Sequence, residues 1–380
     1  MTPLVVLGAT GSIGRQTLDV ARELGIGVAA LAARRGSDLL IETAWGWPDA
    51  RVVVSAPTGE ERQRLVERLG GRVDFGAEAV AGIAAIPGTT VVNGIVGAAG
   101  LPASVAALEA GNRLALANKE SLVAGGPVVA SALRRGGGEL IPVDSEHSAL
   151  HQCLAGEDLD SVRRLVLSAS GGPFRGRDPE ELADVTVAEA LAHPTWTMGR
   201  RITIDSATMM NKAFEVIEAH HLFGIDYDRI DVVVHPQSIV HSLVEFCDGS
   251  IIAQLGEPDM RTHIRYAVTY PRRRAGSADL FDFAGRVLTF EVPDVEAFPA
   301  LRLGYEAGRA GGSAPAVLNA ADEIAVQGFL EGRIGFSMIP VVVERTLESV
   351  ERRDLTSVGD VLAVDREARA VAHQIMGGAC

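Results

Sequence analysis

Apolar and polar positions along the first 140 or so residues predict strands and helices in alternation. Short β-branched runs are each followed by a longer stretch with helical spacing. The expected strands are residues 4–7, 28–32, 51–54, 90–93, 113–117 and 139–142. Because parallel strands need crossover helices between them, this pattern predicts an α/β fold with a doubly wound parallel sheet at the N-terminus.

The pattern changes beyond residue 143, where a second, α+β domain is expected. Its expected strands are residues 165–168, 230–234, 239–246 and 250–255, and a helix is expected at 209–223.

A third region follows a stretch rich in Arg, Gly, Pro and Asp. Helical spacing returns at residues 297–307, 314–330, 337–350 and 358–375, which predicts a C-terminal helical bundle. The domains expected are therefore 1–143, 144–270 and 294–380, with 271–293 as a linker.

Composition narrows the classes of function. The chain has 380 residues and a formal net charge of −14, which argues against a nucleic-acid binder and against a partner of anionic membranes. No apolar run approaches the roughly 20 residues that span a bilayer, and the N-terminus does not resemble a signal peptide. Cys153, Cys247 and Cys380 are scattered, so a reducing cytoplasm is expected.

A glycine-rich turn follows the first expected strand. Gly8, Gly11 and Gly14 are spaced GxxGxxG and lead into a helical stretch. Glycines let the backbone approach a pyrophosphate, and the N–H groups at the helix start bind its charge. The turn predicts a Rossmann-like dinucleotide site, with a tight connection that binds nothing as the alternative.

The end of the second expected strand distinguishes two cofactors. NAD enzymes place an acidic residue there, whereas this chain has Arg34 and Arg35. Guanidinium groups suit a 2′-phosphate, so NADPH is favoured over NADH. Solvated surface charges are the alternative interpretation.

Three carboxylates are candidate metal ligands. Asp144 and Glu146 follow an expected strand, where positions i and i+2 would point the same way, and Glu215 lies on a later expected helix. All-oxygen ligation suits Mg²⁺ or Mn²⁺. Asp144 and Glu146 could instead cap a helix, and a zinc pair of His147 and His151 is less favoured.

Polar clusters further along the chain could hold a phosphate. Hydroxyl, amide and ammonium donors recur at residues 168–173 and 205–208 and at Asn211, Lys212 and His193. Residues 192–200 carry Trp196 and are expected to form a lid. Taken singly, each has an ordinary alternative: Ser170 could form a turn, Lys212 could be a surface charge, and Trp196 could anchor a rigid loop in the core.

Eight motifs match one known family in order along essentially the whole chain. They are residues 8–14, 118–121, 144–148, 170–175, 193–199, 205–212, 235–238 and 256–261. The chain thereby closely resembles the 1-deoxy-D-xylulose 5-phosphate reductoisomerase family. The resemblance implies a homodimeric enzyme that binds a small phosphorylated sugar and forms 2-C-methyl-D-erythritol 4-phosphate for isoprenoid precursors.

The resemblance also implies roles for single residues. Metal binding is expected of Asp144, Glu146 and Glu215. Substrate binding is expected of Lys119, Ser145, Glu146, Ser170, His193, Trp196, Ser206, Asn211, Lys212 and Glu215. NADPH contacts are expected of Thr10, Gly11, Ser12, Ile13, Arg34, Arg35, Asn118, Glu120 and Gly199. Catalytic roles are expected of Lys119, Glu146 and His193.

The chain departs from the family pattern at three places. Arg34-Arg35-Gly36 stands where a Gly-Lys/Arg-Asn type of sequence is usual, His151 replaces an aromatic residue, and Asp322 replaces an Asn.

Two other functions are alternatives. A semialdehyde dehydrogenase would need a catalytic Cys with a nearby base, and a non-catalytic NADP-sensing regulator would not need three carboxylates. Metal-dependent rearrangement is expected to precede hydride transfer.

Overall fold

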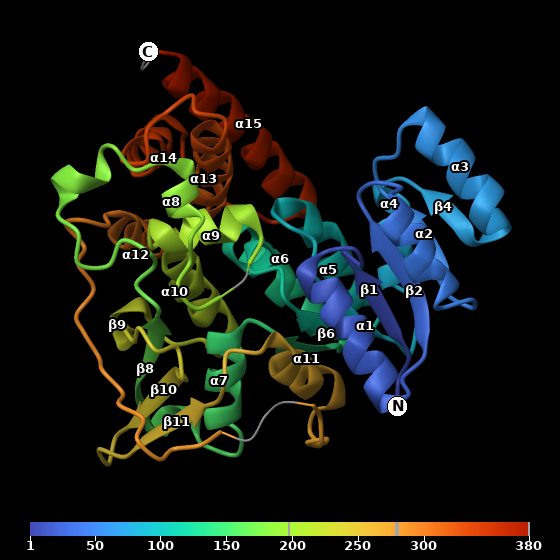
Figure 1. Ribbon diagram of the computed structural model, residues 1–380, viewed down its shortest axis with the longest axis horizontal. Helices are drawn as coiled ribbons and strands as arrows, with labels where there is room; N and C mark the ends of the chain where they lie inside the picture. Colours follow the sequence, from blue (N-terminus) through green and yellow to red (C-terminus); the bar gives the residue numbers. More distant parts are fainter. Residues whose placement is uncertain (197, 278–280, 379–380) are drawn as a thin grey trace. The chain divides into compact units, whose positions relative to one another are not determined.

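A computed structural model of the protein describes residues 1–196, 198–277 and 281–378 (Figure 1). The chain divides into two compact units. Unit 1 consists of Met1–Ser121, Val128–Ser148 and Asp259–Ala278, and unit 2 of Leu122–Pro127, Ala149–Pro258 and Asp279–Cys380. Thr197 and Cys380 lie outside the described residues.

Unit 1 is built on a parallel sheet, as the sequence predicts. Its strands are β1 (Leu4–Leu7), β2 (Val28–Ala33), β3 (Arg51–Val54), β4 (Val73–Phe75), β5 (Thr90–Asn93), β6 (Arg113–Leu116) and β7 (Glu139–Pro142). Within the described residues the strand order is β4-β3-β2-β1-β5-β6-β7, and all the pairs are parallel. The order reverses at β1, which places a switch point between β1 and β5.

Both faces of this sheet are buried. Leu4 and Val6 belong to an apolar core with the first three helices and α11, whereas Val5 and Leu7, which point the other way, are fully buried on the opposite face. Parallel strands covered on both sides explain the nearly continuous apolar runs. β4 was not predicted, because Val73–Phe75 has three residues of which only Val73 is buried.

Helices follow the strands of unit 1 in the expected alternation. They are α1 (Ser12–Leu24), α2 (Asp38–Trp45), α3 (Gly59–Leu69), α4 (Ala77–Ala84), α5 (Leu101–Glu109), α6 (Glu120–Gly136), α7 (Ser145–Cys153) and α11 (Met260–Thr269). The chain returns to this unit as α11, which packs against α1. α6 is kinked at Gly125, next to Pro127, where the chain enters unit 2.

Unit 2 contains a four-stranded sheet of order β11-β10-β8-β9. Its strands are β8 (Val162–Ala169), β9 (Ile230–Val234), β10 (Val240–Phe246) and β11 (Ile251–Leu255). β10 is antiparallel to both neighbours, with Leu243 opposite Val166 and Ala253, and β8 runs parallel to β9. The predicted strand at 165–168 is longer than expected, and the other three lie where they were predicted.

The core of unit 2 surrounds one central helix. The helices are α8 (Val187–Ala190), α9 (Arg200–Ala207), α10 (Met210–Phe223), α12 (Ala300–Ala310), α13 (Ala314–Leu330), α14 (Met338–Ser349) and α15 (Val358–Gly377). Residues Met210–Ala219 of α10 are buried except for Asn211, because the sheet, α9 and α12 pack around them. α13, α14 and α15 pack against one another, which confirms the expected C-terminal bundle (Figure 1).

Two helix boundaries in unit 2 differ from prediction. α12 begins three residues later than expected, because Pro299 occupies its N-cap. α9 was not predicted, and Met209 after it takes a left-handed backbone conformation (φ 64°) as the N-cap of α10. This turn separates the two helices and fixes where Asn211 and Lys212 stand.

Residues 281–295, called the strap below, run beside the edge strand β9. Val234 and Glu291 form an isolated antiparallel bridge, and Nδ1 of His235 lies 2.9 Å from the Thr289 carbonyl oxygen. His235 also stacks on Phe290 with ring centroids 4.8 Å apart. Among the described residues, no helix is both long and apolar enough to cross a membrane.

Candidate active site

The glycine turn after β1 lies at the switch point of the sheet. A Cβ on Gly8, whose φ is +81°, would stand 2.7 Å from the Gly94 carbonyl oxygen, and one on Gly14 would stand 2.3 Å from that of Gly8. Only glycine therefore lets β1, the turn and α1 pack this closely. Gly11 is the N-cap of α1, so the N–H groups at the start of the helix face this turn.

Asn118 and Glu120 shape the loop that follows β5 at the same edge of the sheet. The Asn118 amide donates to the Gly97 carbonyl at 3.0 Å and to Glu120 Oε2 at 2.9 Å. Glu120 Oε1 in turn accepts from the Gly97 N–H at 3.0 Å. Asn118 and Glu120 thus lie at the carboxyl ends of the central strands, and so do residues 10–13. Gly199 lies in unit 2 instead, as the N-cap of α9.

Arg34 and Arg35 directly follow β2 and are exposed. Arg35 Nε forms an ion pair of 3.1 Å with Glu61 Oε1 of α3. Arg64, also on α3, donates to the Gly36 carbonyl oxygen. Arg34, Arg35 and Arg64 thus lie at the turn after β2, where the sequence predicts a 2′-phosphate.

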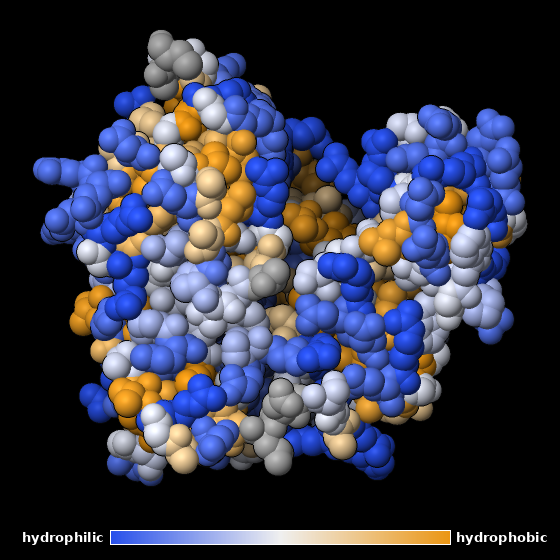
Figure 2. Space-filling model, in the orientation of Figure 1, coloured by the Kyte–Doolittle hydropathy of each residue, from blue (hydrophilic) through white to orange (hydrophobic). Residues whose placement is uncertain are grey.

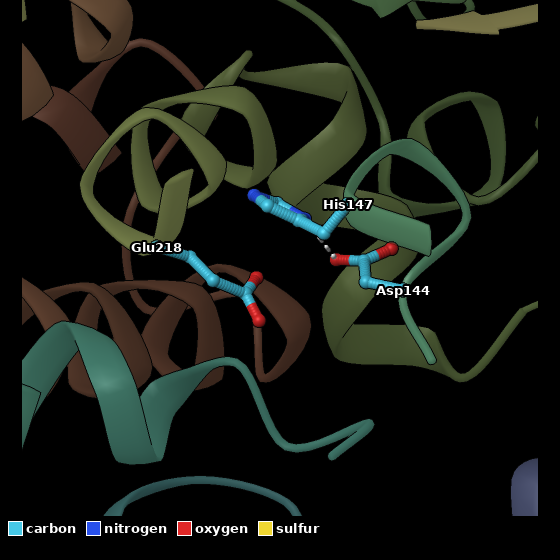
Figure 3. A group of neighbouring side chains, drawn as sticks. All are labelled: Asp144, His147 and Glu218. Atoms are coloured by element: carbon cyan, nitrogen blue, oxygen red, sulfur yellow. Dashed lines mark ion pairs between the residues drawn. The ribbon is translucent and has the colours of Figure 1, made fainter. Parts of the chain in front are cut away.

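Asp144 and Glu146 are held at the start of α7. The Asp144 carboxylate forms an ion pair with Lys119, and Oδ2 lies 3.8 Å from His147 Nδ1 (Figure 3). Ser145 Oγ donates to Glu146 Oε2 at 2.6 Å. The expectation of extended geometry at 144–146 is wrong, because β7 ends at Pro142 and the helix begins at Ser145.

His263 of α11 is a fully buried base near Asp144. Burial lowers its pKa to about 4, although the carboxylates of Asp144 and Asp259 act in the opposite direction. The imidazole is therefore neutral at pH 7.

Glu215 is a buried carboxylate of α10. It has no exposed surface, and its two carboxylate oxygens accept from Asn211 Nδ2 at 2.6 Å and from the Lys212 ammonium. These two donors fix the position of the Glu215 carboxylate. One turn later on α10, Glu218 is fully buried as well, and Figure 3 shows its side chain.

The polar cluster of unit 2 is assembled by a double-glycine turn after β8. Gly171 and Gly172 both have positive φ, and a Cβ on Gly172 would stand 2.8 Å from the Ser206 carbonyl oxygen. The turn therefore brings Ser170 next to the end of α9, from which the chain continues into Asn211 and Lys212. Among the predicted phosphate ligands, Ser170 and Ser206 thus lie at this turn and at α9, and Asn211 and Lys212 lie in the first turn of α10.

Both ring nitrogens of His193 form hydrogen bonds. Nδ1 accepts from the N–H groups of Thr195 and Trp196 at 3.1 and 2.9 Å, so in the neutral ring the proton lies on Nε2 and points to Ser170 Oγ, 3.0 Å away. Partial burial lowers the pKa of His193 and favours this neutral form. The ring thereby joins the expected lid to the serine cluster.

Trp196 is half-buried, and its ring centroid lies 6.3 Å from that of His241 on β10. Thr197, which follows it in the expected lid, lies outside the described residues.

Sequence reasoning missed two buried titratable groups, Glu218 and His263. Glu218 had a signal, because Glu215 and Glu218 are three apart on a helix with apolar neighbours and so share a face. His263 had none, because its burial depends on α11 returning to unit 1.

Cys153 does not fit the role of a catalytic nucleophile. Cys153 is buried, and burial raises the pKa of its thiol to about 11, which keeps it protonated and unreactive at pH 7.

Comparison with known proteins gives consistent matches over the whole chain. Three family models match: 1-deoxy-D-xylulose 5-phosphate reductoisomerase over residues 4–126, the C-terminal domain of that enzyme over 140–223, and the DXP reductoisomerase C-terminal domain over 255–371. The chain belongs to the 1-deoxy-D-xylulose 5-phosphate reductoisomerase family. The sequence resemblance is thereby confirmed, and the dehydrogenase and regulator alternatives are not favoured.

Individual family members match at nearly full length. The reductoisomerase of Chlorobium chlorochromatii is 49% identical over 99% of this chain and 100% of its own, and that of Bordetella avium is 50% identical over 98% of each. The solved Zymomonas mobilis reductoisomerase in complex with NADPH superposes with a TM-score of 0.91 at 44% identity, covering 99% of each chain. A reductoisomerase in complex with NADPH, fosmidomycin and magnesium gives 0.92 at 37% identity, over 99% of this chain and 98% of its own.

Proposed function

We propose that this chain rearranges 1-deoxy-D-xylulose 5-phosphate and reduces the product with NADPH to 2-C-methyl-D-erythritol 4-phosphate, in the presence of a divalent cation. The observation that carries the proposal is the match of nearly the whole chain to members of the family at 49% identity. The solved relatives that contain NADPH and magnesium support both cofactors.

The divalent cation is assigned to Asp144, Glu146 and Glu215. Carboxylate oxygens are the ligands that Mg²⁺ and Mn²⁺ prefer. Each of the three carboxylates already forms an ion pair or accepts a hydrogen bond. A bound cation would polarise the substrate's carbonyl and hydroxyl oxygens as a Lewis acid.

The substrate phosphate is assigned to Ser170, Ser206, Asn211 and Lys212. These residues supply hydroxyl, amide and ammonium donors from the turn after β8 and the ends of α9 and α10. Anchoring the remote phosphate would position the reacting carbons. Ser145 and Lys119 would contact the rest of the substrate.

His193 and Trp196 are assigned to the flap over the substrate. His193 Nε2–H would orient Ser170 Oγ, while Nδ1 holds the backbone of residues 195 and 196. Trp196 would exclude water when the flap closes. Lys119, Glu146 and His193 are the proposed catalytic residues.

NADPH is assigned to the carboxyl edge of the sheet of unit 1. Its pyrophosphate would contact Thr10, Gly11, Ser12 and Ile13, where backbone N–H groups and a helix N-terminus favour anions. Asn118, Glu120 and Gly199 would contact other parts of the cofactor, and Arg34 and Arg35 the 2′-phosphate. In domain terms we assign NADPH binding to 1–143, catalysis and dimerisation to 144–270, a linker to 271–293 and the helical domain to 294–380.

A homodimer is proposed on the basis of the apolar surface of unit 2. Ile251 on the edge strand β11 is 59% exposed, and Phe283, Val287 and Val292 of the strap are 67%, 70% and 90% exposed. Figure 2 shows apolar atoms at the surface where Figure 1 places the strap. Such a surface is typical of a protein interface. Sedimentation of the wild type and of Ile251→Lys with Val292→Lys would show a dimer and a monomer respectively.

A cytoplasmic location is proposed because Cys153 and Cys247 are free thiols in the described part of the chain.

A coupled assay tests the proposed function. NADPH oxidation should require both 1-deoxy-D-xylulose 5-phosphate and Mn²⁺ or Mg²⁺, and it should stop when the metal is chelated. Oxidation without metal, or none with this ketose, would reject the proposal.

A further inference from the structure

Lysine is confined to two positions in this chain. Of its 35 Lys and Arg residues, only Lys119 and Lys212 are lysine. Both are buried, with 6% and 3% of their surface exposed. Lys119 forms an ion pair with Asp144, and Lys212 forms one with Glu215. Every lysine of the protein therefore neutralises a carboxylate that is proposed above to bind the metal.

The carboxylates need such a counter-ion when no cation is bound. Glu215 is fully buried and Asp144 is largely so, with 14% of its side chain exposed. A buried carboxylate without a compensating charge is strongly destabilising. Lys119 and Lys212 supply that charge, each in its own unit.

The same two ammonium groups are also proposed to bind the substrate. An ammonium held against a buried carboxylate is less available to a phosphate or to a substrate oxygen. A divalent cation at Asp144 and Glu215 would supply the compensating charge instead and would release the lysines.

Lysine suits such an exchange better than arginine does. Elsewhere in this chain arginines hold carboxylates through two nitrogens, as Arg369 holds Asp365 at 2.7 and 3.1 Å. That fork fixes one geometry, whereas the lysine ammonium is a point charge on a flexible stem that can turn to another partner.

We propose that Lys119 and Lys212 are exchangeable counter-ions, which the divalent cation displaces from Asp144 and Glu215 so that they can bind the anionic substrate. This proposal rests on the metal and phosphate sites of the proposed function. It requires the cation and phosphate to bind with positive cooperativity, each raising the affinity of the other by the same factor.

The two lysines can be observed directly by nuclear magnetic resonance. Full-length protein labelled with ¹³Cε-lysine should give two lysine signals, assigned by the loss of one in Lys119→Arg and of the other in Lys212→Arg. Mg²⁺ alone should shift both signals, and inorganic phosphate added afterwards should shift that of Lys212. Phosphate should bind about 10-fold more tightly with Mg²⁺ than without, a coupling of ordinary size.

Mn²⁺ binding measured by electron paramagnetic resonance gives a second readout. Lys212→Gln should bind Mn²⁺ more tightly than the wild type without phosphate, and phosphate should no longer raise its affinity. Lys212→Arg should bind Mn²⁺ more weakly than the wild type, because the guanidinium group would hold the Glu215 carboxylate through two nitrogens. Arg333→Gln is the matched control, since it removes an exposed cation of unit 2 that is paired with Glu331, and it should behave as wild type.

The results separate this proposal from the function on which it rests. Mn²⁺ binding that depends on Glu215, combined with lysine signals that Mg²⁺ does not move, would overturn the exchange alone. Persistence of the phosphate effect in Lys212→Gln would do the same. Absence of any Glu215-dependent Mn²⁺ binding in the wild type would overturn both the metal site and the exchange.

Discussion

Unit 1 and unit 2 present different chemistry to their proposed ligands. The turn at residues 8–14 of unit 1 presents mostly backbone, because Gly8 and Gly14 allow the strand, turn and helix to approach closely. In unit 2 the serine cluster and α10 present side chains, among them the buried pair of Lys212 and Glu215. A backbone site depends on how closely the chain packs, whereas a side-chain site depends on charge and hydrogen bonding. Substitutions in the two units should therefore fail in different ways.

The largest effect is expected from a change of charge at constant shape in unit 2. Glu215→Gln should lower kcat/KM by at least about 100-fold and weaken Mn²⁺ binding, because an anionic ligand is lost. The unfolding free energy should fall as well, because the buried Lys212 loses its counter-ion. Steady-state kinetics and Mn²⁺ titration measure this, with the exposed Glu331→Gln as a control that should change neither. Unaltered Mn²⁺ affinity in Glu215→Gln would remove this residue from the metal site.

In unit 1 the largest effects are expected from substitutions that disturb packing at the glycine turn. Gly14→Ala places a Cβ 2.3 Å from the Gly8 carbonyl oxygen, so urea unfolding should show a loss of about 1–3 kcal/mol together with weaker NADPH binding. Gly27→Ala meets no atom within 4 Å and should leave both quantities unchanged. Normal stability in Gly14→Ala would contradict the close packing on which the comparison depends.

Arg34 and Arg35 are exceptions within unit 1, because there the proposed contact is made by side-chain charge. Replacing both by Ala should weaken NADPH binding about 10-fold, or roughly 1.4 kcal/mol, and leave NADH binding unchanged. Arg51→Ala, another exposed arginine of unit 1, is the matched control. Equal losses for the two cofactors would reject the 2′-phosphate assignment.

Each unit also contains a histidine whose pKa is lowered to about 4 mainly by burial, His263 in unit 1 and His221 in unit 2. Because an unfolded histidine titrates near 6.5, the unfolded state binds more protons between pH 6.5 and 4. The stability that these residues contribute is complete above pH 6.5 and falls as the pH drops towards 4, by up to about 1.4 kcal/mol per pH unit for each.

Measuring the unfolding free energy against pH without metal tests this linkage. His263→Gln and His221→Gln should each flatten the acid slope by a similar amount, because both pKa values are lowered to about 4. A slope that neither substitution alters would show that other groups cause the acid dependence.

The same contrast explains what could be predicted from the sequence. The turn at 8–14 is contiguous, so spacing alone located it, and the strands that carry it were predicted to within a residue. The serine cluster of unit 2 depends on long-range packing, such as the approach of Gly172 to Ser206, which has no local signal. The same holds for the pairing of Lys119 with Asp144 and for the burial of His263.

Local errors had local physical causes. Pro299 at the N-cap makes α12 begin later than predicted, and the left-handed Met209 separates α10 from α9, which was not predicted. At 144–146 the choice between a strand end and a helix start was open, and the structure has the helix. The carboxylates are candidate ligands with either geometry, because their residue types and the family resemblance do not depend on that choice.

Product analysis tests the central claim most directly, since both proposed sites must act on one substrate. Nuclear magnetic resonance of the product formed from 1-deoxy-D-xylulose 5-phosphate with NADPH and Mg²⁺ should show the branched 2-C-methyl-D-erythritol 4-phosphate. The branched aldehyde phosphate, supplied directly, should be reduced to the same product. An unrearranged, reduced sugar phosphate as the main product, or failure to reduce the branched aldehyde, would contradict the account.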